Sequence, residues 1–200
     1  MRELEYPFDS EWILKKAKSI KKTLLSDGTT RIKKKIAVLG GSTTHDVIKI
    51  LELFLLHYGI EPSFYESEYG QYWQDAMFDN PELAEFAPDL IYIHTTNRNI
   101  AEYPAVGDSR EKTEQLLKDT YEHFHVMWEK LKETYGCVII QNNFEFPYYR
   151  LLGNMDAVSP NGRVAFVNRL NALFAEYAAA GDSFYLQDIQ YLSACYGLDK

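Results

Sequence analysis

Short apolar runs alternate with longer helical periodicities along this chain. Runs of four to six residues that are rich in β-branched and aromatic side chains are typical of buried strands. The stretches between them place apolar residues three and four positions apart, as in Leu117, Tyr121, Phe124 and Trp128, which predicts helices with one buried face. The predicted strands are 35–39, 63–66, 89–94, 137–140 and 183–186. The predicted helices are 46–58, 108–135, one through 167–177 and a short one ending near Gly197.

Strands that alternate with helices predict an α/β protein with a parallel sheet covered on both faces. Five such units fit a three-layer α/β/α, flavodoxin-like arrangement with strand order 2-1-3-4-5, in which ligands bind beyond the carboxyl ends of the strands. Asp108 with Glu111 three residues later predicts a capping box for the long helix. The helix over 46–58 is apolar nearly all round, so we expect it to be buried.

The first 34 residues read as an arm in front of this α/β domain, which is expected over 35–200. Ile13, Ala17, Ile20 and Leu24 form a helical apolar stripe, and the lysines between them fall largely off that face. Residues 1–35 carry a charge of +5, whereas the remainder carries −13. The arm is therefore expected to pack on the acidic body with its lysines in water, or to offer them to an acidic partner.

Composition narrows the class of protein. With 200 residues, 46% of them hydrophobic, the chain can build one sizeable core. A net charge of −8 argues against binding nucleic acid or anionic membranes. The apolar runs are too short to span a bilayer, and the first residues have no signal-peptide core. Two cysteines provide neither a disulfide framework nor a metal site, so a cytoplasmic protein is expected.

Polar side chains follow every predicted strand, at the edge where a ligand is expected. Gly41 and Ser42 follow the first strand, in a turn whose amides suit an anion, and Ser42 is a nucleophile, a helix cap or a phosphate ligand. The other strand-end candidates are His45, Glu66, His94, Asn97, Asn143 and Asp188. His45 and His94 are candidate bases for Ser42, because the first and third strands are expected to be neighbours.

Further residues are expected to form the walls of the pocket. Glu66, Tyr69 and Tyr72 belong to a polar, aromatic segment after the second strand, which forms either a pocket wall or a surface loop. Arg98 and Arg150 are the arginines near the predicted crevice and suit an anionic ligand, although both also suit pairing with the acidic surface. A metal site of Glu66, His45 and His94 is the less favoured reading, and no metal or cofactor is predicted for this domain.

The whole pattern resembles the N-terminal domain of FkbH-like proteins, which has an SGNH-hydrolase-like fold. The resemblance rests mainly on Gly-Gly-Ser-Thr-Thr at 40–44 and on Tyr-Gly-Gln-Tyr at 69–72. The other segments that carry it are 4–9, 36–39, 64–68, 86–89 and 169–171, with Asp188 and Gly197. In that family a phosphatase domain of the haloacid-dehalogenase superfamily follows, with its magnesium. No such element follows here, so an N-terminal fragment is expected.

The resemblance implies roles for individual residues. Ser42 matches the SGNH nucleophile, Gly70 the glycine oxyanion donor, Asn97 the asparagine donor with Asn99 as rival, and Asp188 the triad acid. Tyr191 stands where the triad histidine belongs, and a serine without its base is a poor nucleophile. FkbH-like proteins load a glyceryl unit from a phosphorylated donor onto an acyl carrier protein.

Three functions stay open. The first is a non-hydrolytic domain that binds an acyl or phosphorylated molecule, or a carrier-protein arm, for a phosphatase domain. The second is an SGNH-type esterase or acyltransferase that uses Ser42, and the third is a docking or dimerisation domain. The missing histidine after Asp188 favours the first over the second.

Overall fold

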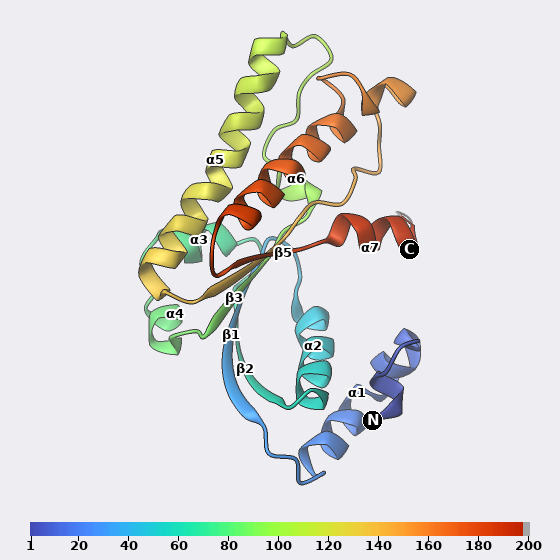
Figure 1. Ribbon diagram of the computed structural model, residues 1–200, viewed down its shortest axis with the longest axis vertical. Coiled ribbons are helices and arrows are strands. Elements are labelled where there is room, and N and C mark those ends of the chain that lie inside the picture. The colour runs from blue at the N-terminus through green and yellow to red at the C-terminus, as the bar shows by residue number, and fades with distance from the viewer. Residues whose placement is uncertain (198–200) are drawn as a thin grey trace.

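Five parallel strands form one sheet in the order β2-β1-β3-β4-β5 (Figure 1). The computed structural model describes residues 1–197, so the last three residues of the expected domain lie outside the described part. The strands are β1 (Ile32–Gly40), β2 (Ile60–Glu66), β3 (Leu90–His94), β4 (Val138–Asn142) and β5 (Phe184–Gln187). The predicted fold class and strand order are confirmed.

Helices lie on both sides of this sheet. In order they are α1 (Ser10–Leu25), α2 (His45–His57), α3 (Tyr72–Met77), α4 (Pro81–Phe86), α5 (Arg110–Tyr135), α6 (Arg163–Ala180) and α7 (Ile189–Tyr196). Three 3-10 turns are η1 (Arg2–Leu4), η2 (Asn97–Asn99) and η3 (Gly153–Ala157). α5 and α6 cover one face, α1 and α2 lie on the other side, and α7 projects away from the sheet (Figure 1). No element had been predicted where α3 and α4 stand.

The main core lies between the sheet and α5 with α6. Ile91, Ile93 and Ile139 point into it from the strands and are fully buried, as the two-residue alternation of a strand requires. Trp128 of α5 is also fully buried, and its ring lies 4.7 Å from those of Phe174 and Phe184. This aromatic centre fixes α5 and α6 against β4 and β5.

The arm has a second, smaller core. Asp9 caps α1 by accepting a hydrogen bond from the backbone N–H of Trp12 at 2.9 Å. The predicted stripe of Ile13, Ala17, Ile20 and Leu24 is buried as expected, and it packs against Leu53 and Leu56 of α2. Within residues 1–197, no helix has the length and apolar character that crossing a bilayer requires.

Two local predictions are wrong. The N-cap of α5 is Ser109, whose hydroxyl accepts from the N–H of Lys112. The Asp108 carboxylate instead binds the N–H of Ala105 and the ammonium of Lys112, both at 2.7–2.8 Å, so the expected capping box does not form. β1 begins at Ile32 rather than Lys35, because its exposed first residues pair with β2 from Ile60 onward.

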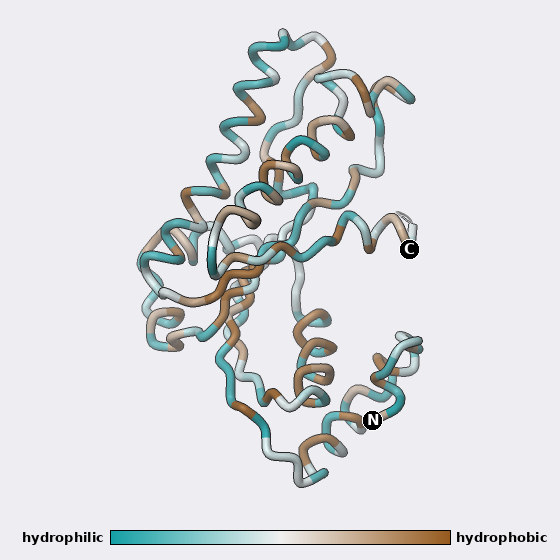
Figure 2. The backbone as a smooth tube through the Cα atoms, in the orientation of Figure 1, coloured by the Kyte–Doolittle hydropathy of each residue, from teal (hydrophilic) through white to brown (hydrophobic). Residues whose placement is uncertain are grey.

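α2 is also less buried than its composition predicts. Its side chains are apolar over most of its surface (Figure 2), but only Leu53 and Leu56 are fully buried. Val47 and Tyr58, two apolar residues of the segment 46–58 that was expected to be buried, are 38% and 70% exposed. The helix packs on α1 and on β2 at the edge of the sheet, and this leaves part of its apolar surface open.

Candidate functional site

A cavity of about 670 Å³ lies beyond the carboxyl ends of the strands. That is the position at which doubly wound sheets bind their ligands, and the volume is in the usual range of ligand sites. Its wall residues come from four loops, from the end of β3, from the start of α6 and from α7 with the residue that follows it. They are Gly41, Ser42, Tyr69, His94, Thr95, Thr96, Asn97, Arg98, Glu145, Phe146, Pro147, Tyr148, Tyr149, Arg163, Ile189, Ser193 and Gly197.

The turn after β1 brings Ser42 to this cavity. The Gly41 N–H donates to the carbonyl of His94 at 2.8 Å, and the Gly41 carbonyl accepts from Asn99 Nδ2 at 2.9 Å. A Cβ at Gly41 would lie 2.5 Å from the Asn99 amide, so a larger residue here would displace the Asn99 side chain from its hydrogen bonds. The N-cap residue of α2 is Thr44, and its hydroxyl donates to Glu66. Ser42 therefore does not cap the helix, and in residues 1–197 its hydroxyl has no hydrogen-bond partner.

The two asparagines after β3 have different positions. Asn97 lines the cavity, but its Nδ2 donates to Glu145 Oε1 at 2.7 Å and its backbone N–H points to the same carboxylate. Asn99 holds the Gly41 carbonyl and accepts from the N–H of Thr96 at 2.8 Å, which closes the capping box of η2. Asn99 thus shapes the loop, and Asn97 presents its amide to a carboxylate.

Of the two candidate bases, only His94 lines the cavity. Its Nδ1 lies 3.0 Å from the Tyr92 hydroxyl, and burial lowers the pKa of the imidazole, so the ring is neutral at pH 7. Burial also raises the pKa of Tyr92 to about 12. The partner of this imidazole is therefore a neutral phenol, which stabilises an imidazolium far less than the carboxylate of a catalytic triad does.

His45 and Glu66 lie together outside the cavity walls. The His45 side chain is exposed, and its Nδ1 is 3.5 Å from Glu66 Oε2. Glu66 Oε1 accepts from the Thr44 hydroxyl at 2.8 Å. These contacts tie the start of α2 to the end of β2. Within residues 1–197, no group of three or more His, Cys, Asp or Glu side chains is arranged to hold a metal ion.

Asp188, the expected triad acid, caps α7. Its Oδ1 accepts from the N–H of Tyr191 at 3.0 Å and from Asn143 Nδ2 at 2.8 Å, and Asn143 Oδ1 accepts from the N–H of Gln190 at 2.9 Å. Asn143 is buried and belongs to this clamp rather than to the cavity wall. The carboxylate orients the start of a helix, and Tyr191 is exposed where the resemblance expects a histidine.

The predicted wall after β2 is only partly present. Tyr69 lines the cavity. Tyr72 does not, because it lies in α3 with its ring in the main core, and that prediction is wrong. Gly70 is outside the cavity walls and has a φ of +73°, the left-handed turn conformation that favours glycine. Arg150 is exposed and is not a wall residue, whereas the preceding Tyr148 and Tyr149 are.

Two residues that sequence reasoning missed set the charge of the cavity. Glu145 follows the predicted fourth strand by a few residues, which was a usable signal. Arg163 begins α6 and lies over the Tyr103 ring at 5.2 Å, and its buried Nε has no partner in the described residues. Arg98 is the other cation of the wall, and neither arginine forms an ion pair within residues 1–197. In this part of the chain the two guanidinium groups have no carboxylate partner, whereas the Glu145 carboxylate is already bound by the Asn97 amide. This arrangement favours an anionic ligand.

Fold and cavity together define a class, a doubly wound α/β domain with a polar, ligand-sized site at the carboxyl edge of its sheet. The chain belongs to the family described as FkbH, N-terminal domain, which matches it over residues 35–200. No curated protein matches the sequence.

The fold is similar to that of a solved structure described as the N-terminal part of the protein BF1531 from Bacteroides fragilis, containing a phosphatase domain, complexed with Mg. The TM-score is 0.73 at 18% sequence identity, over 90% of this chain and 47% of that one. This identity shows a shared fold alone, and the present chain spans about half the length of that solved chain.

Proposed function

We propose that this domain binds a small anionic molecule, an acylated or phosphorylated compound, in the cavity at the sheet edge without hydrolysing it. The domain would present that compound, free or on the arm of an acyl carrier protein, to a phosphatase-type domain. The observation that supports this proposal most directly is that, in the described part of the chain, Ser42 lines the cavity without the paired catalytic base and acid of a triad. The family supports the context, because the described neighbour contains a phosphatase domain.

The arrangement around Ser42 supports binding over hydrolysis. His94 is paired with a phenol and Asp188 with a helix terminus, so within residues 1–197 no carboxylate backs the imidazole of the cavity wall, and the pair of His45 with Glu66 lies outside that wall. Asn97, which matches the SGNH amide donor, already gives its Nδ2 hydrogen bond to Glu145. Ser42 and the arginines are instead free to donate to an oxyanion of a ligand that stays intact.

The first prediction concerns the serine. We expect no covalent adduct when the folded protein is treated with a fluorophosphonate probe and read by intact mass, because Ser42 has no activating base. The Ser42→Ala variant is the control and should give the same spectrum. An adduct on the wild type that is absent from the variant would support the esterase hypothesis, with His94 as the displaced base.

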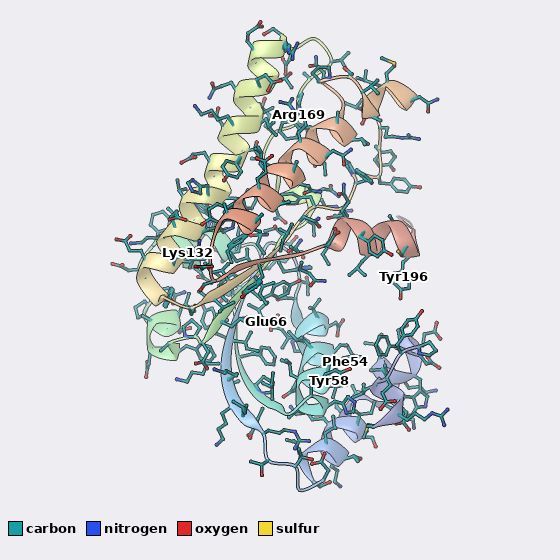
Figure 3. The ribbon with its side chains drawn as sticks, viewed as in Figure 1. Phe54, Tyr58, Glu66, Lys132, Arg169 and Tyr196 are labelled. Carbon is teal, nitrogen blue, oxygen red and sulfur yellow. The ribbon has the colours of Figure 1, made fainter. Side chains whose placement is uncertain are left out.

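The second prediction concerns the anion site. In isothermal titration calorimetry with a phosphorylated three-carbon acid, Arg163→Gln should weaken binding about 10- to 100-fold, because a charge-assisted hydrogen bond contributes about 1.5–3 kcal/mol. The matched control is Arg169→Gln on the same helix. Arg169 points from α6 towards α5 (Figure 3) and pairs with Glu114 outside the cavity, so its loss should leave affinity unchanged.

Two results would count against the anion site. Equal losses in the two arginine variants would mean that the cavity does not hold the anion. A folded wild-type protein that shows no heat of binding would overturn the proposal and leave the docking or dimerisation alternative.

A further inference from the structure

The sheet face on the α2 side carries an apolar groove of about 340 Å³. Its floor is Ile36 of β1, Leu90 and Tyr92 of β3 and Ile140 of β4. Its wall is Val47, Leu51 and Leu55 of α2, and Gln187 and Ile189 complete its lining. Leu90, Tyr92 and Ile140 are only partly buried, whereas Ile91 and Ile139, which point to the opposite face, are completely buried. α2 therefore leaves the middle strands partly open on this face.

This groove lies next to the cavity at the sheet edge. Ile189 lines both, at the first turn of α7. Tyr92 of the groove floor is hydrogen-bonded to His94 of the cavity wall at 3.0 Å, and both side chains leave β3 on the same face. A ligand that extends past His94 would thus leave a polar cavity and enter a hydrocarbon-lined groove.

α7 does not fill the groove. None of its residues is buried, and it projects away from the sheet (Figure 1). Asn143 clamps Asp188 and the N–H of Gln190, which fixes this direction at the first turn. Parallel sheets are almost always covered on both faces, because exposed aliphatic side chains on their strands cost hydrophobic free energy. The groove is of ligand size, and its volume is at the lower end of the usual range.

We propose that the ligand of the cavity has an unbranched hydrocarbon tail, and that this tail lies in the groove between α2 and β3. The ligand class is an amphiphile with a carboxylate or phosphate head next to Arg98 and Arg163 and an acyl or alkyl chain over Leu90, Tyr92 and Ile140. This inference rests on the proposed function for the position of the head. A phosphorylated three-carbon acid would bind in the cavity and leave the groove empty.

A chain-length series tests the tail. With alkyl phosphates from ethyl to decyl, we expect affinity to rise about fourfold for each added methylene until the groove is full, since each buried methylene contributes a roughly constant increment. Val47→Trp places a large side chain in the groove from a position that is 38% exposed, so the fold should tolerate it. This variant should bind ethyl phosphate as the wild type does and lose the rise with chain length. Leu51→Phe is the second variant and should shorten the rise.

The matched control is Tyr58→Trp at the C-terminal end of α2 (Figure 3). This position is 70% exposed and outside the groove, so the variant should keep the wild-type dependence of affinity on chain length.

Binding of ethyl phosphate with no dependence on chain length would overturn the proposed tail and leave the proposed anion site unaffected. Dependence on chain length that Val47→Trp leaves intact would place the tail elsewhere and also overturn it. Rising affinity of the long chains with no effect of Arg163→Gln would support the tail and contradict the proposed head site. A protein that dimerises and binds none of the series would show that a second copy covers the groove.

Discussion

Replacing Trp128 with alanine should lower the free energy of unfolding by about 3–5 kcal/mol, the usual cost of truncating a buried Trp or Phe. The side chain is fully buried at the centre of the aromatic cluster of α5, α6 and β5, so its removal leaves a cavity that rigid neighbours cannot fill. Most small domains are stable by only about 5–15 kcal/mol, so the variant should be close to unfolding. Urea unfolding followed by far-ultraviolet circular dichroism measures the loss.

A conservative variant separates packing from hydrogen bonding at this position. The indole N–H of Trp128 donates to Gln141 Oε1 at 3.1 Å, and Gln141 Nε2 donates to the Thr95 hydroxyl at 3.0 Å. Trp128→Phe leaves a buried acceptor without its donor, which should cost about 1–3 kcal/mol in addition to the lost contacts. Trp12→Phe, on the partly exposed first turn of α1, is the control and should cost well under that. Equal costs at the two positions would contradict a role for the Gln141 bond.

The sheet order was predictable because strand and helix signals are local. Apolar runs and helical periodicities depend on neighbouring residues, and the handedness of parallel crossovers then leaves few arrangements. The errors occurred where two local solutions were nearly equivalent. Asp108 and Ser109 are adjacent, and both residue types favour the N-cap position. The Asp108 carboxylate pairs with Lys112, and Ser109 is the N-cap of α5. The open flank of α2 was not predictable, because a helix that is apolar around most of its circumference does not show which apolar residues its neighbours leave uncovered.

The site was predictable in position but not in its contacts. The rule that ligands bind at the carboxyl edge of the sheet leads to Ser42, His94 and Asn97, and all three line one cavity. It does not show which strand-end side chains are already engaged, since the partner of Asp188 is a helix terminus and that of Asn97 is Glu145. Arg163 is far from any strand in sequence and reaches the cavity only through the long connection before α6.

Asn142 is the polar residue under the cavity whose loss should matter most. It is fully buried at the end of β4, its Oδ1 accepts from the Thr95 N–H at 2.8 Å, and its Nδ2 donates to the carbonyls of Thr95 and Asn143. Thr95 is itself fully buried and forms part of the cavity wall. Asn142→Ala leaves these backbone groups without partners, at a cost of about 1–3 kcal/mol for each.

Asn142→Asp should make that cost depend on pH. Its carboxyl can accept from the Thr95 N–H but can donate to a carbonyl only when protonated, and burial of the charged form raises the pKa of the group above the unfolded value of about 3.9. The unfolded chain therefore releases this proton at a lower pH than the folded chain does. The free energy of unfolding of Asn142→Asp should fall as pH rises above about 4. It should continue to fall until the new carboxyl is ionised in the folded state as well.

Urea unfolding between acidic and neutral pH, with the wild-type profile subtracted, measures this dependence. The control is Asn154→Asp, at an exposed position in η3, where the new carboxyl stays in water and the subtracted profile should be nearly flat. A pH-independent loss in Asn142→Asp would contradict the buried hydrogen-bond network. If the expected dependence is found, the variant should also bind the anionic ligand more weakly at neutral pH than at acidic pH. The reason is that Thr95, which Asn142 holds in place, is part of the cavity wall.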